Sequence, residues 1–190
     1  MEDKKCLICI FIYLEVKKWG KWLVIEEVKR NYLDIYSLQD LKEGMKPSDD
    51  YSLSLIDPIN FQLNKFFYKN IGKKHKWVDR LTWSEEKWIN YVSSKNVRTY
   101  VFKFKDDLVG FFELIYHEQK NETEIAYFGI LEEYQNKKLG SYLLSEAIKK
   151  SFKDNVSRVW VHTCSLDHRN ALNNYIARGM KVFKSENLKI

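Results

Sequence analysis

The stretch Y-Q-N-K-K-L-G-S-Y-L-L at residues 134–144 joins two segments of different periodicity. The run before it, 122–131, has the composition of a buried strand, and the segment 138–152 places apolar residues at helical spacing. The chain therefore runs from a strand through a sharp turn into a helix. Because the start of a helix leaves backbone N–H groups unpaired and carries partial positive charge, this turn predicts an anion site.

Three residues within the turn suit a phosphate ligand. Gly140 removes a side chain where a phosphate could approach the backbone, and Lys137 and Lys138 add positive charge. The turn is not a P-loop, because G-x-x-x-x-G-K-[ST] is absent, and it lacks the dinucleotide fingerprint G-x-G-x-x-G. The alternative is an ordinary strand-to-helix connection that happens to contain lysine and glycine.

Outside this turn, the chain alternates predicted strands and helices. The second half predicts strands at 98–105, 108–117, 122–131, 158–164 and 180–184 and helices at 138–152 and 168–178. The first half predicts strands at 6–16, 21–28, 32–36 and 51–57, a helical turn from Ser37, a helix at 61–71 and a second helix opened by the capping box Thr82–Glu85. No repeat or low-complexity linker interrupts the series, so the sequence predicts one mixed α/β domain.

The composition is that of a single globular domain with a modest positive charge. Its 190 residues are 45% hydrophobic and 31% charged, and the net charge is +6. Lysine and arginine are scattered among acidic residues without a long basic tail, and the usual nucleic-acid-binding motifs are missing. We therefore expect no nucleic-acid partner, whereas a positive field suits a phosphate-bearing ligand.

The N-terminal region predicts neither a membrane anchor nor a metal site. The apolar run Cys6–Leu14 is too short to span a bilayer, and no small-residue cleavage site follows it. Cys6 and Cys9 form a C-x-x-C within a predicted strand, where their side chains would point to opposite faces. Three cysteines in all suggest a reducing compartment. We therefore expect a cytoplasmic protein that binds no metal and no membrane.

Aromatic side chains are concentrated between Phe61 and Tyr91. Packing explains such a cluster in most proteins, and the alternative is that some of these rings line an acceptor pocket. The segment holds Phe66, Phe67, Tyr68, Trp77, Trp83 and Trp88.

Several blocks of the chain resemble one known superfamily. Residues 134–144 resemble the coenzyme A signature [QR]-x-x-G-x-[GA] of the GNAT N-acetyltransferases. The block W-V-H-T-C-S-L-D-H-R-N-A-L-N-N-Y-I-A-R-G-M at 160–180 resembles the last helix of that superfamily and the tyrosine before its closing glycine. The blocks V-H-T-C-S-L-D-H, A-Y-F-G-I-L and A-L-N-N-Y are similar to a bacterial GNAT subfamily, whose acceptor side the segments L-N-K-F-F-Y-K-N-I-G and W-V-D-R-L-T-W-S-E-E-K-W resemble. The resemblance covers roughly residues 31–185.

Two residues depart from the pattern of the resembled family. Lys138 stands at the first glycine of the signature, so coenzyme affinity should suffer if that position needs positive φ or bare backbone. His168 stands where many relatives have an asparagine that contacts the coenzyme, and the nearby Asn170 is a candidate substitute.

The resemblance implies a fold and a cofactor. The fold would be a mixed central β-sheet of about six to seven strands, splayed in the middle and flanked by helices. Residues 31–190 would form the acyltransferase domain, and residues 1–30, outside the resemblance, an N-terminal extension that is predicted to be a hairpin. The co-substrate would be acetyl-CoA, and the residues implied to bind it are Phe128, Ile130, Gln135, Asn136, Lys137, Lys138, Leu139, Gly140, Ser141 and Asn170.

The resemblance also implies catalytic roles. Tyr175 matches the tyrosine that protonates the leaving sulfur in many relatives, and Glu124 matches the placement of a general base. An ordinary glutamate has a pKa of about 4.3, so Glu124 would need burial to serve as a base. Glu113 on the preceding strand is the rival, and a water molecule is a further possibility. On the acceptor side we expect Asp79, Trp77 and Glu113 to bind substrate.

These observations favour transfer of an acetyl group to a primary amine by direct attack on the thioester. The acceptor could be a small molecule or a protein lysine. The resemblance also implies that the protein could form a homodimer. The alternatives are a catalytically silent coenzyme A-binding module and a basic nucleic-acid adaptor. A nucleophilic triad of Cys164 with His162 and Asp167 is not expected, because these residues are adjacent in one strand and turn, whereas triads converge in space.

Overall fold

The structure, a computed structural model, describes residues 27–189 and is built on a seven-stranded mixed sheet. The strands lie in the order β2-β3-β4-β5-β6-β1-β7, and every neighbouring pair is antiparallel except β5 and β6. Their bounds are β1 Glu27–Ile35, β2 Tyr51–Leu55, β3 Val97–Phe104, β4 Asp107–His117, β5 Glu122–Ile130, β6 Arg158–Cys164 and β7 Lys181–Lys189.

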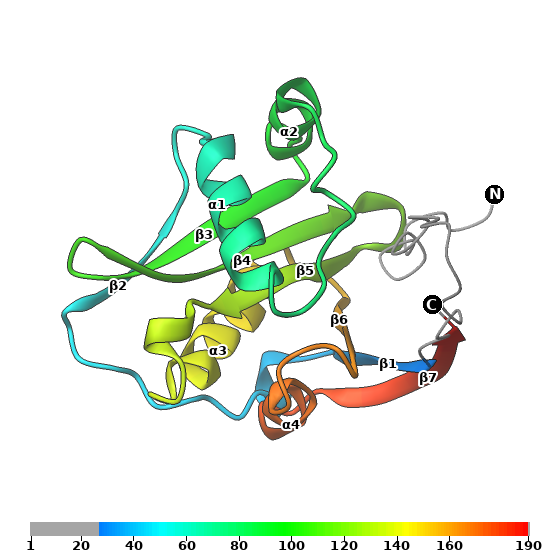
Figure 1. Ribbon diagram of the computed structural model, residues 1–190. Coiled ribbons are helices and arrows are strands. Elements are labelled where there is room, and N and C mark those ends of the chain that lie inside the picture. Colours follow the sequence, from blue (N-terminus) through cyan, green and yellow to red (C-terminus); the bar gives the residue numbers. More distant parts are fainter. Residues whose placement is uncertain (1–26, 190) are drawn as a thin grey trace, which may run out of the picture.

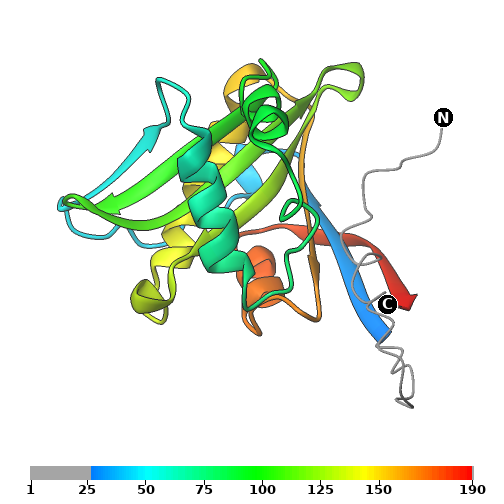
Figure 2. The same cartoon turned by 45° about the horizontal axis from the view of Figure 1, so that its top comes forward.

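Four α-helices cover the two faces of the sheet (Figures 1 and 2). Helices α1 (Phe61–Gly72) and α2 (Glu85–Val92) lie on one face, and α3 (Leu139–Ser151) and α4 (Ala171–Ala177) lie on the other. Short 3-10 helices are found at Leu38–Asp40, Glu118–Lys120, Glu132–Tyr134 and Phe152–Asp154.

The parallel pair β5–β6 is joined over a very short length. Only Glu122–Glu124 pair with Arg158–Trp160, and beyond these residues the two strands separate, as Figure 1 shows. On the other side of β5, the register with β4 shifts between the pairs Glu113–Tyr127 and Leu114–Ile125, so Ala126 has no partner there. Such a bulge bends a strand and increases its twist. The sheet is therefore open in its middle.

Two hydrophobic cores hold the layers together. On the α3 side, the core joins that helix to the strands through buried residues such as Leu143, Leu144, Ile148, Val159, Val161 and Phe112. On the α1 side, the smaller core is aromatic and contains Phe67, Tyr68, Trp88, Phe111 and Tyr127. Most of the aromatic residues between 61 and 91 thus pack, as the sequence indicated.

Local chemistry fixes where the early helices begin. The Asn60 side chain accepts a hydrogen bond from the Leu63 N–H and starts α1, and Ser84 accepts one from Lys87 N–H and starts α2. Helix α2 therefore begins two residues later than the predicted Thr82–Glu85 capping box, with Ser84 as its N-cap. At the end of α4, Gly179 has φ of 97°, and a Cβ there would lie 2.1 Å from the Asp40 carbonyl oxygen.

The predicted fold class is confirmed, and three boundaries are corrected. The sequence predicts two separate strands at 21–28 and 32–36. In the structure, β1 runs without a break over Glu27–Ile35, because β6 and β7 pair with it on both sides. The last strand extends to Lys189 rather than 184 through its ladder with β1. Helix α4 is shorter than predicted and begins at Ala171. The predicted N-terminal hairpin lies outside the described residues except for its last part.

No helix within residues 27–189 is long and apolar enough to cross a membrane.

Candidate functional site

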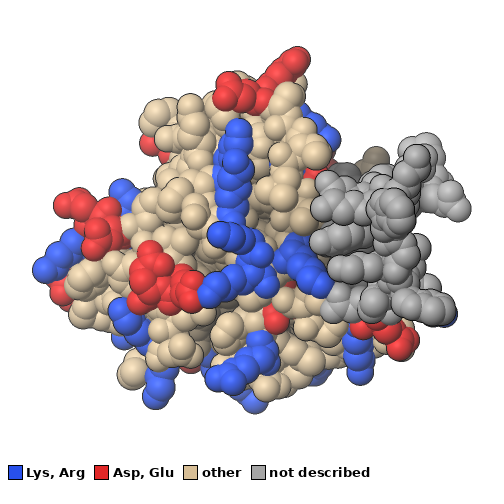
Figure 3. All heavy atoms as spheres, viewed as in Figure 1, with Lys and Arg blue, Asp and Glu red and all other residues tan. Residues whose placement is uncertain are grey.

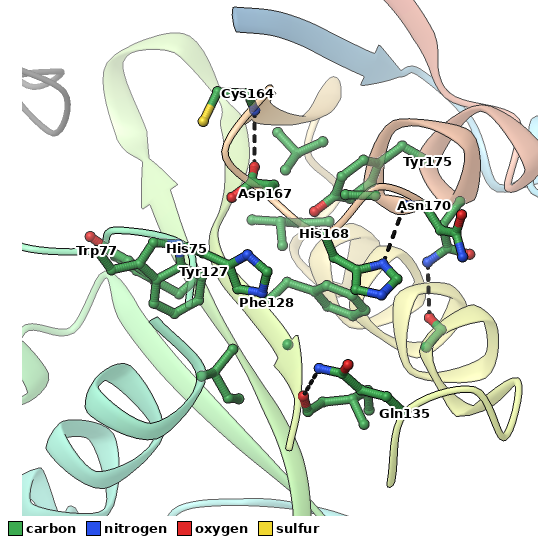
Figure 4. A pocket seen from close by; sticks show the side chains of 18 of the residues that line it. His75, Trp77, Tyr127, Phe128, Gln135, Cys164, Asp167, His168, Asn170 and Tyr175 are labelled. Carbon is green, nitrogen blue, oxygen red and sulfur yellow. Dashed lines mark hydrogen bonds between the residues drawn. The ribbon is translucent and has the colours of Figure 1, made fainter. Parts of the chain in front are cut away.

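A cavity of about 490 Å³ lies where β5 and β6 separate (Figure 4). Its walls come from β5, β6, the start of α3, α4 and the segment that follows α1. Figure 4 shows His75, Trp77 and Tyr127 on one side of the cavity and Gln135, Asn170 and Tyr175 on the other. The lining also includes Arg30, Lys76, Asn136, Lys138, Gly140, Ser141, His162, Cys164 and Asn174.

The turn into α3 is formed by two residues in the left-handed region. Asn136 and Lys138 have φ values of 61° and 60°, and no side chain caps the helix that Lys138 opens. The Ser141 hydroxyl instead donates to the Lys138 carbonyl oxygen at 2.7 Å. The first N–H groups of α3 therefore have no side-chain acceptor, and they border the cavity.

Gly140 lies in the first turn of α3 next to open space. A Cβ added to it would have one heavy atom within 4 Å, the Asn174 Nδ2 at 3.9 Å. That amide donates to the Gly140 carbonyl oxygen at 3.2 Å and so connects α4 to α3. A side chain at position 140 would therefore point into the cavity rather than into the protein.

The edge of β5 offers unpaired backbone to the cavity. Because pairing with β6 ends at Glu124, the residues from Ala126 to Ile130 have no strand partner on that side within the described chain. Phe128, Gly129 and Ile130 line the cavity at this edge. Gln135 reinforces the turn that follows, because its Nε2 donates to the Ile130 carbonyl oxygen at 3.2 Å. An extended amide-containing ligand could hydrogen-bond here as a substitute strand.

Tyr175 presents its hydroxyl group to the cavity from α4 (Figure 4). The side chain is only 6% exposed, and its ring lies 6.3 Å from that of Phe128, centroid to centroid. Its hydroxyl has no hydrogen-bond partner among residues 27–189. Burial, and to a smaller degree the Asp167 charge, raises the pKa of the Tyr175 phenol well above its ordinary value. The group therefore keeps its proton over the whole physiological range.

Aromatic rings form the opposite end of the cavity. Trp77 and Tyr127 meet edge to face with 4.9 Å between centroids, and Figure 4 shows both beside His75. The His75 Nδ1 lies 3.2 Å from the Leu166 carbonyl oxygen, which joins the segment after α1 to the loop after β6. This end is suited to an apolar or aromatic group.

Asp79, Arg80 and Glu113 form a buried network behind that aromatic wall. Asp79 accepts hydrogen bonds from the hydroxyl groups of Tyr68 at 2.7 Å and Tyr127 at 2.9 Å. The Arg80 guanidinium contacts Glu113 at 2.9 Å, and these side chains are 6% and 1% exposed. Burial opposes the charge of Arg80, but Glu113, Tyr91 and Tyr127 together outweigh it and raise the pKa of Arg80 well above its usual value. Neither acid lines the cavity.

Glu124 lies close to the cavity but does not line it. Its Oε2 is 2.9 Å from the Nε2 of His117, and the two side chains are 15% and 25% exposed. The imidazole of His117 in turn stacks on Trp160, with 6.0 Å between centroids. The Glu124 carboxylate is thus held next to His117, which stacks on Trp160, and it is not among the residues that line the cavity.

The charged groups that line the cavity are mostly basic. Arg30, Lys76 and Lys138 carry positive charge, and Asp167 is the one acidic side chain in the wall. Asp167 is already engaged, because one of its oxygens accepts hydrogen bonds from the Thr163 hydroxyl at 2.7 Å and the Cys164 N–H at 2.9 Å. Figure 3 shows Lys and Arg side chains gathered across the middle of the face seen in Figure 1. The local field therefore favours an anionic ligand.

Comparison with known sequences identifies the family. Residues 61–180, which include the turn, the open strand edge and Tyr175, match the Acetyltransferase (GNAT) family. The chain belongs to the GNAT acetyltransferase family. No curated protein matches the chain significantly.

Solved structures with the GNAT fold resemble this one at low sequence identity. A GCN5-related N-acetyltransferase from Sphaerobacter thermophilus has a TM-score of 0.66 at 13% identity, over 87% of this chain and 53% of its own. Spermidine N-acetyltransferase from Vibrio cholerae, solved with CoA and spermine, has a TM-score of 0.57 at 17% identity, over 75% of this chain and 96% of its own. An aminoglycoside acetyltransferase from an uncultured soil metagenomic sample has a TM-score of 0.57 at 11% identity, over 68% and 88%.

Three of the similar structures are considerably longer than this GNAT chain. It spans 62%, 53% and 57% of the proteins from Staphylococcus epidermidis, Sphaerobacter thermophilus and Kribbella flavida. These likenesses therefore support the GNAT fold and not a shared substrate.

Most of the residues predicted for the site come together in the cavity of this GNAT domain. Those that line it are Trp77, Phe128, Ile130, Gln135, Asn136, Lys138, Leu139, Gly140, Ser141, Asn170 and Tyr175. Lys137, Asp79, Glu113 and Glu124 lie outside it; the Lys137 amine, for example, lies 4.7 Å from the centre of the Tyr134 ring. Among the lining residues that the sequence did not single out for the site are Arg30, His75, His162 and Asn174. Two of them fall within the quoted blocks V-H-T-C-S-L-D-H and A-L-N-N-Y, so a signal was present for these.

Proposed function

We propose that this protein is an acetyl-CoA-dependent N-acetyltransferase that acetylates the primary amine of a small molecule. The observation that carries the proposal is the meeting of three features in one cavity. These are an uncapped helix start, an unpaired strand edge and the hydroxyl of Tyr175. The helix start would bind phosphate, the strand edge would hydrogen-bond the thioester arm, and the hydroxyl would protonate the leaving sulfur. Membership of the family supports the reaction class.

The coenzyme would bind along the wall formed by β5 and α3. Its diphosphate would accept hydrogen bonds from the first N–H groups of α3, where the helix dipole and Lys138 favour negative charge. Its pantetheine amides would pair with the free edge of β5 around Phe128 and Ile130. Asn170, near the start of α4, lies at the same end of the cavity.

The same strand edge would activate the thioester. A backbone N–H near Phe128 or Ile130 would donate to the carbonyl oxygen and stabilise the negative charge that develops when the amine attacks. The C–N bond forms, the C–S bond breaks, and the Tyr175 hydroxyl gives its proton to the departing sulfur. Because burial raises the pKa of Tyr175, the hydroxyl is protonated whenever the enzyme turns over at neutral pH.

The aromatic end of the cavity favours a small acceptor with an apolar body. Trp77 and Tyr127 provide flat walls. Among the described residues that line the cavity, a polycation would find one carboxylate, that of Asp167, which already accepts two hydrogen bonds. We therefore expect monoamines to be better acceptors than spermidine or aminoglycosides, although proteins named for those acceptors share the fold.

Free-thiol release from acetyl-CoA, measured with a panel of amines, tests this function. The panel should contain arylalkyl monoamines, amino acids, spermidine, an aminoglycoside and a lysine peptide. Turnover with a small monoamine, and its loss in Tyr175→Phe, would support the proposal. Tight coenzyme binding without thiol release from any amine would indicate a catalytically silent module instead.

A further inference from the structure

Proton removal from the acceptor amine is the step of the proposed function that the carboxylates do not readily explain. An alkylammonium has a pKa near 10, so a group inside the cavity must take its proton before the nitrogen can attack. Such a group must reach the amine directly or through one water molecule. Glu113 is buried in an ion pair with Arg80, and Glu124 is bound to His117; neither carboxylate lines the cavity.

His162 occupies the position that this step requires. It lies on β6, two residues after Trp160, the last residue to pair with β5, so it borders the gap between the two strands. Along β6, Val161 and Thr163 are buried, whereas His162 alternates with them and is only half-buried. Its side chain lines the cavity, as do those of Trp77 and Tyr127.

The ring nitrogens of His162 make no hydrogen bond to the part of the chain that the structure describes. Within residues 27–189 neither nitrogen has a hydrogen-bond partner, and the ring contacts Tyr32 with 6.0 Å between centroids. Each of the other three imidazoles has one ring nitrogen engaged: that of His75 by the Leu166 carbonyl, that of His117 by Glu124 and that of His168 by the Asn170 N–H. His162 therefore has both a lone pair and an N–H available to a ligand.

The surroundings of His162 keep it neutral at the pH of the reaction. Burial lowers the pKa of its imidazole below the ordinary 6.5, and the positive charge of Arg30 on β1 acts in the same direction. Three carboxylates oppose them: Glu124 on β5, Asp167 in the loop after β6 and Asp79 after α1. Burial is the largest influence, so the lone pair is free above about pH 6.5.

We propose that His162 is the catalytic residue that takes the proton from the acceptor ammonium. The inference rests on the proposed acetyl transfer. His162 receives the first proton from nitrogen and returns it to water, and the freed lone pair then forms the C–N bond. As the C–S bond breaks, Tyr175 protonates the sulfur. The second proton of the nitrogen passes through water to Tyr175, so one proton is released for each amide formed.

Substitution of His162 by glutamine tests the assignment, because glutamine keeps a hydrogen-bonding side chain but cannot be protonated. We expect kcat/KM for the amine to fall about 100-fold or more, in the range of general-base catalysis, while the Kd for acetyl-CoA stays within about twofold. The matched control is His117→Gln, which removes an imidazole from the same face outside the cavity and should change kcat/KM by less than about threefold.

The pH profile separates His162 from Glu124 as the proton acceptor. In the wild type, kcat/KM should fall as the pH drops through the pKa of His162, and nuclear magnetic resonance titration of that imidazole in the folded protein should give the same value. Because the Glu124 charge raises this pKa, Glu124→Gln should move the acid limb to lower pH and keep most of the activity at pH 8.

Each outcome decides the assignment. Unchanged activity and an unchanged acid limb in His162→Gln would overturn it while the acetyl transfer itself stands. Loss of activity at every pH in Glu124→Gln would give the role to that carboxylate. A mismatch between the kinetic and titrated values would also overturn the assignment, even if the glutamine variant failed to fold. Absence of turnover by the wild type with every amine would remove the proposed function and this inference together.

Discussion

At the scale of single residues, Lys138 shows how this GNAT chain departs from its family signature. The first glycine of the signature is lysine here, and the structure places it at φ of 60°. For a residue with a Cβ the left-handed region costs roughly 1–2 kcal/mol, a cost that glycine does not have. The sequence predicted a lower coenzyme affinity if this position needed positive φ; the backbone has that conformation, and the affinity stays a prediction.

Replacing Lys138 by glycine should therefore raise the free energy of unfolding. Relief of the left-handed strain outweighs the greater backbone entropy of glycine, so we expect a gain of about 0.5–1 kcal/mol in urea denaturation. Lys137→Gly is the matched control, because Lys137 lacks positive φ and the change should lower stability. Equal destabilisation by both variants would contradict the strain argument.

Tyr175 supports a second prediction at this scale. Tyr175→Phe removes one oxygen that has no hydrogen-bond partner among the described residues, so the fold and the Kd for acetyl-CoA should not change. We expect kcat to fall about 10- to 100-fold, because the leaving sulfur loses its proton donor. Steady-state kinetics at saturating acetyl-CoA measure this, and a variant with full kcat would remove Tyr175 from the mechanism.

The pH profile of the wild type gives a related prediction. Because the pKa of Tyr175 is raised, the wild type should show no loss of activity through ionisation of Tyr175 up to pH 10.

At the scale of elements, the start of α3 carries the coenzyme assignment. Its first N–H groups lack a capping side chain, and Gly140 in the first turn borders open space. A strand-to-helix connection with no ligand to bind does not require both features in one cavity, whereas a phosphate site uses both.

Gly140→Ala and Gly140→Val form a graded test of that assignment. Because an added Cβ would meet only the Asn174 amide at 3.9 Å, neither variant should lose stability in thermal unfolding. Coenzyme binding should weaken in the order glycine, alanine, valine as the side chain fills the space expected for a phosphate, by about tenfold or more for valine. Isothermal calorimetry gives the Kd values. If Gly140→Val binds the coenzyme as tightly as the wild type, the phosphates do not bind at the start of α3.

At the scale of the whole molecule, the site depends on a sheet that is open between β5 and β6 and covered by helices on both faces. One hydrophobic core lies on the α1 face and a larger one on the α3 face, and Tyr134 packs against both. The buried network of Arg80 and Glu113 ties α2 to β4 behind the acceptor wall, because Arg80 also donates to the Tyr91 hydroxyl at 2.7 Å. We expect this network to serve stability.

Glu113→Gln should therefore unfold more easily without losing its chemistry. Removing the carboxylate leaves the buried Arg80 charge with only the longer contact to Asp79 at 3.9 Å, and breaking a buried ion pair costs about 3–5 kcal/mol of unfolding free energy. Activity per folded molecule should stay near that of the wild type. The control Glu118→Gln breaks the exposed pair with Lys95 and should have no measurable effect on stability. A stable but inactive Glu113→Gln variant would revive its role as a base.

The sequence by itself determined the order of the elements, the turn that follows β5 and the family. These are local properties: periodicity along the chain separates strands from helices, and the residues 134–144 carry the coenzyme signature in one continuous block. Tyr175 could be found in the same way, because it lies in a second block that ends at a glycine. Even the strain at Lys138 was foreseeable, since it follows from a missing glycine.

Only the tertiary structure decided which groups share the cavity. Glu113 is an attractive base in the sequence, but it pairs with Arg80, which is 33 residues away. His162 lies in a block that resembles the family, but it borders the cavity only because β5 and β6 stop pairing before it is reached. The length of a strand ladder and the partner of a buried charge depend on contacts between distant segments. Burial and free hydrogen-bonding capacity follow from those contacts, so no local pattern specifies them.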